Sequence, residues 1–399
     1  MNSNNDVYLN HMGMVSSLGR EPSVVLRRLL AGERGLWAES DWLEERDAYV
    51  GRIAESDLAV ARGSVTQLGW DSRVNRLLLA ALQDIEPQVR SAVSRYGADR
   101  VGLVLGTSTS GILESEVALV QWSLQQTLPD DFSYWKQELG CVSEFLAHSL
   151  GIEGPSYTLS TACTSSAKAM AAGSRLLNSG LCDAVVVGGA DTLCQLTLRG
   201  FAALEAMSQG LCSPFSASRD GINIGEAAVL FLMTKEPAEV ALCGAGETSD
   251  AYHISAPDPA AKGAIAAMGA ALRQAGSPNL DYLNLHGTAT RQNDAMESRA
   301  VSEVLAGTVP VSSTKGLTGH TLGAAGALEA AFCWLLLSGV NTDNALPANV
   351  MQGAYDAELP AINLLTEPGQ YRRQGQNWMM SNSFAFGGNN IALLFRGEN

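Results

Sequence analysis

Short runs of Val, Ile and Leu alternate along the chain with longer segments in which apolar residues recur at helical spacing. The short runs predict strands buried inside a sheet, at 101–105, 184–187, 228–233, 282–285 and 391–395. Helices are predicted at 72–85 and 167–177. Strands that alternate with helices are typical of layered α/β proteins. No proline-rich linker or low-complexity tract divides the chain.

The two halves of the chain contain related segments in the same order. Two pairs of segments match, 159–163 with 312–315 and 225–231 with 388–395. Both segments of the first pair lead into a helix of small residues. This repetition predicts a duplicated fold with halves at 1–237 and 238–399. Each half then brings one loop ahead of a helix to a shared centre, Cys163 from the first half and His320 from the second.

A length of 399 residues also suits two packed halves, because it exceeds the usual range of a single domain. Hydrophobic residues make up 46% of the chain and 40 residues are glycine, as in a well-buried globular enzyme. The longest apolar run, 330–340, is too short to cross a membrane and predicts a buried helix. The polar N-terminus, 1–6, lacks the basic and apolar regions of a signal peptide.

The cysteine content and the net charge limit the compartment and the partners that the protein can have. The seven cysteines form no CxxC pair, which predicts free thiols in a reducing cytoplasm. A net charge of −15 and a pI of about 4.8 argue against nucleic acid or an anionic membrane as partner. The chain has neither a complete GxGxxG fingerprint nor a P-loop, so no nucleotide cofactor is predicted.

Cys163 is the first candidate for chemistry. Small residues flank it on both sides in 160–167, which lets the backbone turn sharply from strand to helix and leaves the sulfur open to a ligand. A thiol at a helix N-terminus is expected to favour the reactive thiolate. The alternative is a buried structural cysteine, the interpretation that fits Cys182, Cys194 and Cys333 in their apolar surroundings. Local context alone leaves both open.

The five histidines add a second set of candidates. His286 directly follows an apolar strand, where α/β enzymes place catalytic groups. His320 lies in a glycine-rich turn that opens a helix. His11 and His148 are interpreted as core or packing residues, and His253 as structural. No two histidines have ligand-pair spacing and no cysteine lies near them in sequence, so no metal site is predicted.

Four spaced motifs then agree with one family. They are TACTSSA at 161–167, HGTAT at 286–290, KGLTGHTLGAAG at 315–326 and SNSFAFGG at 381–388. With them the sequence resembles β-ketoacyl-acyl-carrier-protein synthases of the elongating Cys–His–His type, over nearly the whole chain. The resemblance implies a thiolase-like fold, with two duplicated α/β halves packed as α-β-α-β-α layers. It also implies a dimer.

The resemblance also implies a reaction and its residues. An acyltransferase of this family joins an acyl thioester on Cys163 to malonyl-carrier protein by decarboxylative Claisen condensation. The products are 3-oxoacyl-carrier protein and CO2, in fatty acid or specialised polyene or polyketide synthesis. His286 and His320 bind the malonyl thioester and drive the loss of CO2. Lys315 and Glu329 orient the His320 side.

Further residues are implied around the substrate. The backbone N–H groups of Cys163 and Phe386 form the oxyanion hole, and Thr288 and Thr290 bind the pantetheine arm. Phe384 and Phe386 form a gate over the acyl pocket. No cofactor of the enzyme's own is implied, because phosphopantetheine arrives on the carrier protein.

Some positions depart from the family pattern. Ala385 stands where the family usually has glycine, and Asn389 where threonine is common. A Cβ at position 385 is expected to restrict φ and stiffen the gate loop. The stretch 63–69, often basic in the family, carries no charge here. These changes fit a specialised pathway, such as polyene or polyketide assembly, at least as well as they fit housekeeping fatty acid synthesis.

The implied partners are acyl carrier protein, malonyl-carrier protein, and a second subunit in a homodimer or in a heterodimer with a related ketosynthase-like chain. In a heterodimer the chain is either the catalytic or the chain-length-determining subunit. An acidic carrier needs a local basic patch, for which Arg27 with Arg28 or Arg73 with Arg76 are candidates. Ordinary solvated helix charges are the alternative interpretation of both pairs.

Overall fold

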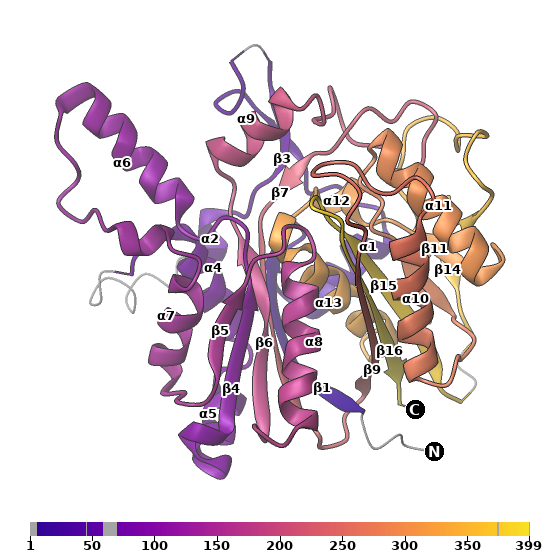
Figure 1. Ribbon diagram of the computed structural model, residues 1–399, viewed down its shortest axis with the longest axis horizontal. Helices are drawn as coiled ribbons and strands as arrows, with labels where there is room; N and C mark the ends of the chain where they lie inside the picture. Colours follow the sequence, from indigo (N-terminus) through magenta and orange to yellow (C-terminus); the bar gives the residue numbers. More distant parts are fainter. Residues whose placement is uncertain (1–5, 45, 59–69, 373–374, 399) are drawn as a thin grey trace.

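The computed structural model describes residues 6–44, 46–58, 70–372 and 375–398 (Figure 1). Its centre is a mixed sheet of eleven strands. These are β1 (Val7–Ser16), β4 (Val101–Gly106), β5 (Ser156–Leu159), β6 (Ala184–Asp191), β8 (Ala227–Thr234), β9 (Val240–Ser249), β10 (Tyr282–Asn284), β11 (Pro310–Ser312), β13 (Asn363–Leu364), β15 (Asn377–Phe384) and β16 (Asn389–Gly397). The strand order is β13-β11-β10-β15-β16-β9-β1-β8-β6-β4-β5.

The strand order repeats between the two halves of the sheet. The first half reads β5-β4-β6-β8-β1 and the second reads β11-β10-β15-β16-β9. In the two halves, β4 and β10 are each parallel to both neighbouring strands, whereas β8 and β16 are each antiparallel to both. The halves meet where Val7 and Tyr8 of β1 pair with Leu242 and Ala241 of β9. This order matches the duplication predicted from the sequence, and the connection from β8 to β9 spans the position where the halves were divided.

Helices form three layers around the two half-sheets, which confirms the predicted layered α/β fold (Figure 1). The layers contain α4 (Arg73–Leu82), α5 (Glu86–Tyr96) and α7 (Cys141–Leu150) on one outer face, α8 (Ser165–Asn178) and α13 (Ala325–Leu337) in the middle, and α10 (Lys262–Gln274) and α11 (Arg291–Leu305) on the other outer face. Side chains of α8 and α13 share one core with strands of both halves.

Further helices and strands lie outside these layers and the central sheet. The remaining helices are α1 (Pro22–Leu30), α2 (Glu55–Leu58), α6 (Ile112–Gln125), α9 (Gln195–Ala203) and α12 (Lys315–Thr318), with 3-10 turns at Ala98–Arg100, Tyr134–Gln137 and Leu322–Ala324. The remaining strands are β2 (Trp37–Glu39), β3 (Ala48–Gly51), β7 (Ile224–Gly225), β12 (Ala345–Leu346) and β14 (Gly369–Gln370).

Close packing of α8 against α13 sets the distance between the two halves of the site. A Cβ on Gly326 would lie only 2.6 Å from the Cβ of Ala167, so glycine is required where the helices touch. The helix α13 is apolar on all sides and buried almost throughout, as expected of a helix enclosed between two sheets. The loop before each helix is therefore held near the same point.

The structure contradicts a core position for two histidines, and the prediction of free thiols is confirmed. His11 and His148 are exposed rather than in the core, although the ring of His148 packs edge-on against Trp70 at 5.2 Å between centroids. All seven cysteines lie in the described residues and are free thiols. Within those residues no helix is both long and apolar enough to cross a membrane.

Candidate active site

Cys163 lies in the sharp turn between β5 and α8. The preceding Ala162 has a φ of +51°, a left-handed conformation that L-residues rarely adopt. The hydroxyl of Ser165 stabilises this turn, because it accepts from the N–H of Thr161 at 2.9 Å and donates to the carbonyl of Ala162 at 2.6 Å. The strained turn is therefore held by hydrogen bonds that place the Cys163 side chain ahead of the helix.

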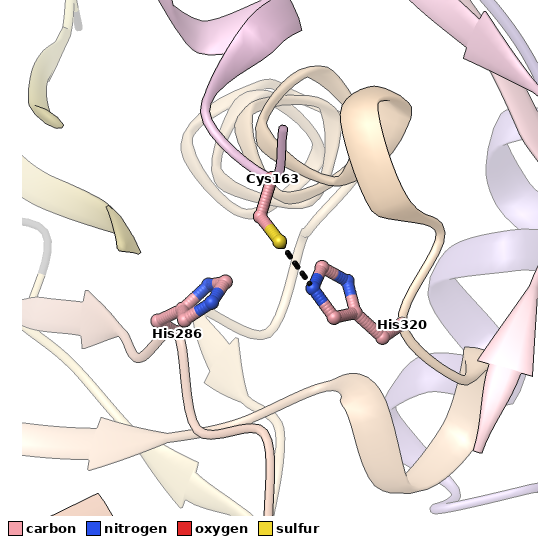
Figure 2. A group of neighbouring side chains, drawn as sticks. All are labelled: Cys163, His286 and His320. Carbon is pink, nitrogen blue, oxygen red and sulfur yellow. Dashed lines mark hydrogen bonds between the residues drawn. The ribbon is translucent and has the colours of Figure 1, made fainter. Parts of the chain in front are cut away.

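Three side chains from separate segments meet in front of this turn (Figure 2). The Sγ atom of Cys163 lies 3.0 Å from Nε2 of His320. The ring of His286 stands nearly perpendicular to that of His320, at 87° with 5.3 Å between centroids. All three residues are buried, and Cys163 is 7% exposed. The fold thus brings together the three residues that the sequence motifs singled out.

Lys315 and Glu329 lie behind the histidines as a buried ion pair. The ammonium of Lys315 is 3.3 Å from Nδ1 of His286. The family resemblance implied that this pair orients the His320 side, but the structure places the ammonium against His286 instead. Because an ammonium only donates, Nδ1 of His286 must accept, so the ring proton of His286 lies on Nε2.

Backbone contacts fix the two histidine loops. Glu297 of α11 accepts from the N–H groups of His286 at 2.8 Å and Gly287 at 2.7 Å. The backbone of His320 is bonded on both sides, to Asn223 O at 2.7 Å and to Gly225 N at 3.0 Å. Sequence reasoning missed Glu297, since one more acidic residue on a charged helix carries no distinguishing signal.

Asp191, at the end of β6, is a second buried carboxylate that the sequence did not reveal. It accepts from the N–H groups of Ser108 and Thr109 at 2.8 Å, and from that of Gly323 at 2.5 Å. It therefore connects the loop after β4 to the turn that follows His320. Asp191 lies four positions beyond the strand predicted at 184–187, so no local signal in the sequence marked it.

Burial sets the protonation of the site. Burial raises the pKa of Cys163 to about 11, although the Lys315 ammonium and the N–H groups of Phe386 and Cys163 oppose the shift. Burial, followed by the charge of Lys315, lowers the pKa of both His286 and His320 well below the ordinary value. The resting site is therefore a thiol beside neutral imidazoles. Desolvation of the buried sulfur therefore opposes the thiolate that a helix N-terminus favours.

This protonation state predicts how Cys163 reacts with a small alkylating agent. The rate of carbamidomethylation at Cys163 should rise continuously from pH 7 to pH 10, because the thiolate fraction grows until the pH passes a pKa of about 11. Peptide mass spectrometry after timed exposure to iodoacetamide measures the rate. A rate that levels off below pH 8 would contradict the raised pKa.

A cavity of about 490 Å³ leads to the three residues. Among the residues that line it are the substrate-binding candidates Thr288, Thr290, Phe384 and Phe386. The hydroxyl groups of the two threonines are 3.0 Å apart. The ring of Phe384 lies 6.0 Å from that of His286, while Phe386 is 36% exposed at the mouth.

The backbone N–H groups of Cys163 and Phe386 both lower the pKa of the Cys163 thiol. The loop that carries Phe386 turns at Gly387 and Gly388, whose φ values are +83° and +77°. Ala385 does not adopt positive φ. A Cβ at position 385 therefore causes no strain in this conformation, and the glycines that the turn requires are in place.

The donor atoms of Cys163, His286 and His320 lie within 4.8 Å of one another, a set that zinc could bind. The sequence argument from ligand spacing does not apply to residues that folding brings together. The surroundings nevertheless do not fit zinc. A metal-bound histidine gives its second N–H to an acceptor, whereas Nδ1 of His286 faces an ammonium. Nδ1 of His320 has no partner among the described residues.

Fold and site together define the class of thiolase-fold enzymes with a Cys–His–His centre. The family models described as β-ketoacyl synthase, N-terminal domain, and β-ketoacyl synthase, C-terminal domain, match residues 11–238 and 239–347. The chain belongs to the β-ketoacyl synthase family, whose members are acyltransferases.

Relatives and solved structures agree with this assignment. The chain is 32% identical to the mitochondrial 3-oxoacyl-[acyl-carrier-protein] synthase of Arabidopsis thaliana, over 98% of this chain and 93% of that protein. It is 28% identical to 3-oxoacyl-[acyl-carrier-protein] synthase 2 of a Synechocystis strain, over 98% and 97%. It is 44% identical to a chain of the ketosynthase ApeO in complex with its chain length factor ApeC from Xenorhabdus doucetiae, with a TM-score of 0.90 over 99% and 98%.

Proposed function

We propose that this protein is a 3-oxoacyl-[acyl-carrier-protein] synthase. An acyl group moves from its carrier to Cys163, and the carrier leaves as a free thiol. Malonyl-carrier protein then loses CO2, and the resulting enolate attacks the acyl carbonyl on Cys163. The new carbon–carbon bond displaces the Cys163 thiolate, which takes up a proton. The product is 3-oxoacyl-carrier protein.

The acyl-transfer step relies on Cys163, His320 and two backbone groups. With its pKa raised to about 11 the thiol is protonated, and Nε2 of His320 lies 3.0 Å away as the acceptor for that proton when the sulfur attacks. The N–H groups of Cys163 and Phe386 stabilise the oxyanion of the tetrahedral intermediate. Thr288 and Thr290 on the cavity wall bind the pantetheine arm.

The malonyl step relies on neutral imidazoles. The Lys315 ammonium at Nδ1 keeps the ring proton of His286 on Nε2, where it can donate to the malonyl thioester oxygen. Once Cys163 carries an acyl group, Nε2 of His320 no longer accepts from a thiol, so the ring proton of the neutral imidazole can shift from Nδ1 to Nε2 and be donated to the same oxygen. Two donors aimed at a developing enolate lower the barrier to loss of CO2 in a dry cavity. Glu329 holds Lys315 in place.

The observation that carries the proposal is the meeting of Cys163, His286 and His320 at one cavity, although 157 positions separate the cysteine from His320. The test is intact mass spectrometry of the enzyme after incubation with a panel of acyl-carrier proteins of different chain lengths. We expect one acyl group on Cys163 and CO2 release when malonyl-carrier protein is added. If no carrier in the panel acylates the enzyme and no CO2 is released, the proposal is wrong.

Two alternative functions are those of a thiolase and of a non-catalytic subunit in a heterodimer. A thiolase needs a second catalytic cysteine, but Cys333 is fully buried in the shared core. A non-catalytic subunit lacks the nucleophile, whereas this site is complete. The chain is therefore proposed as the catalytic subunit, acting in the cytoplasm without a cofactor or metal of its own.

The pathway is proposed to be specialised rather than housekeeping. Identity to a chain of the complex between a ketosynthase and its chain length factor is 44%, against 32% and 28% for the two 3-oxoacyl-carrier-protein synthases. By the same comparison we expect the second subunit to be a related ketosynthase-like chain. A homodimer is the alternative, and hydrodynamic measurements on the chain alone and mixed with the related subunit distinguish the two.

The surface around α6 fits a second subunit. This helix projects from the body of the molecule (Figure 1). No charged residue occurs at 117–129, and Val120, Trp122 and Leu124 on it are exposed. In the same half of the chain, β5 is the outermost strand at one edge of the sheet. An exposed apolar segment without charge and an open sheet edge both favour contact with another chain.

We predict that Val120→Glu with Trp122→Glu prevents dimerisation, because two carboxylates would be buried without partners. Light scattering after gel filtration of each protein mixed with the related subunit should give the mass of two chains for the parent and of one chain for the variant. Leu181→Glu, at an equally exposed leucine outside this surface, is the control and should remain dimeric. A dimeric double variant would show that the interface lies elsewhere.

The two arginine pairs that are candidates for binding a carrier differ in their exposure. Arg73 is buried and bonded to Glu226, so it cannot bind a carrier. Arg76 is paired with Asp71. Arg27 on α1 is exposed and Arg28 is paired with Glu33, so of the two candidate pairs the α1 pair is the one that offers an accessible positive charge. The stretch 63–69 lies outside the described residues.

A further inference from the structure

Lys168 has no role in the chemistry described above, yet it lies one turn into α8, the helix that begins just after Cys163. Its side chain is half-buried, and its ammonium donates to the amide oxygen of Asn389 at 2.7 Å. Desolvation lowers the pKa of Lys168, while the negative charge of Glu247 opposes the shift. A lysine that gives up hydration in this way needs a specific acceptor.

Asn389 closes the loop that contains Phe386. The N–H of Ala385 donates to the carbonyl of Asn389 at 2.8 Å, and the N–H of Gly388 donates to the carbonyl of Ala385 at 3.0 Å. These two bonds make 385–389 a compact turn with the N–H of Phe386 at its centre. Movement of Asn389 therefore moves the Phe386 N–H with it.

The other connections of this turn run to the second half of the protein. The N–H of Gly387 donates to the carbonyl of Ile254 at 2.7 Å, and the N–H of Asp250 donates to the carbonyl of Gly388 at 2.8 Å. Within the described residues, Lys168 is the only side chain of α8 that hydrogen-bonds to the turn. It connects the nucleophile helix to the loop that carries the second oxyanion donor.

We infer that Lys168 is a positioning residue, which acts through Asn389 to fix the Phe386 N–H relative to the N–H of Cys163. The inference rests on the proposed function, because these two donors form an oxyanion hole only if Cys163 is acylated. The two donors come from different halves of the duplicated fold, so their spacing is not set by either half alone. A small displacement of such a donor reduces the rate of acylation more than it reduces the affinity for the carrier.

The test measures single-turnover acylation of Cys163 at a range of acyl-carrier concentrations. We expect Lys168→Met and Asn389→Leu each to slow acylation about tenfold at saturating carrier, the effect of losing a charged hydrogen bond. The carrier concentration at half-maximal rate should not change. Lys168→Arg should recover most of the rate, since it retains a cationic donor. The double variant should be no slower than either single variant.

Arg175→Met is the matched control. Arg175 lies two turns further along α8 and is bonded to Glu247 at 2.5 Å, so its loss leaves the hydrogen bond from Lys168 to Asn389 in place. It should acylate at the parent rate. CO2 release from malonyl-carrier protein, which depends on the histidines, should stay near the parent value in all of these variants.

Parent-rate acylation in Lys168→Met or in Asn389→Leu would overturn the inference, and so would effects that add in the double variant. Asn389→Asp, which keeps the acceptor, provides an independent arm if Lys168→Met does not fold, and it should acylate near the parent rate. A parent enzyme that no carrier acylates would instead remove the proposed function, and this inference with it.

Discussion

The Cys163→Ala enzyme is expected to accept no acyl group from any carrier and to form no 3-oxoacyl product. Among the residues lining the cavity, Cys163 is the one with a thiol, so its loss removes the covalent intermediate that splits the reaction in two. The variant should still release some CO2 from malonyl-carrier protein, because His286 and His320 remain. Intact mass spectrometry and a CO2 assay measure the two activities separately.

Cys194→Ala is the matched control for this experiment, because Cys194 has a setting similar to that of Cys163. Cys194 is buried at the N-terminus of α9, and burial raises its pKa to about 11 as it does for Cys163. It has no histidine beside it and does not line the cavity. The control should be acylated at the parent rate. Acyl label on any other cysteine of the Cys163→Ala protein would contradict the assignment of the nucleophile.

The sequence predicted the arrangement of the fold better than the ends of its elements. The repeated segments correctly indicated two halves with the same strand order. The strand predicted at 184–187 continues to Asp191, since Gly188 and Gly189 pair with both neighbouring strands. A Cβ on Gly189 would lie 2.3 Å from a carbonyl oxygen of β4. Glycine is required there by contact, but it removes the apolar signal that marks a buried strand.

The sequence also identified the three residues at the centre of the site, because each lies in a motif with unusual local composition. It could not give their electrostatics. The contact of Lys315 with His286 joins positions 29 apart, and burial of the Cys163 thiol depends on the whole fold. Glu297 and Asp191 support the site through backbone N–H groups, which leave no trace in residue type.

Loss of either histidine is expected to separate the two half-reactions. His286→Ala should release CO2 from malonyl-carrier protein roughly 10²–10³-fold more slowly, the usual effect of removing one preorganised donor. It should still acylate Cys163, because Nε2 of His320 remains 3.0 Å from the sulfur in the parent geometry. His320→Ala should lose CO2 release to a similar extent, and it should also slow acylation, since the acceptor of the thiol proton is gone. Lys315→Ala should resemble His286→Ala, because the ammonium sets the tautomer of that ring.

The experiment follows acylation of Cys163 by mass and CO2 release in the same preparations. His148→Ala, at an exposed histidine outside the cavity, should match the parent in both assays. The geometry predicts which histidine variant loses acylation. Acylation should fall in His320→Ala and be preserved in His286→Ala, because only His320 contacts the sulfur. A His286 variant that fails to acylate but releases CO2 at the parent rate would reverse the roles of the two rings and contradict the mechanism.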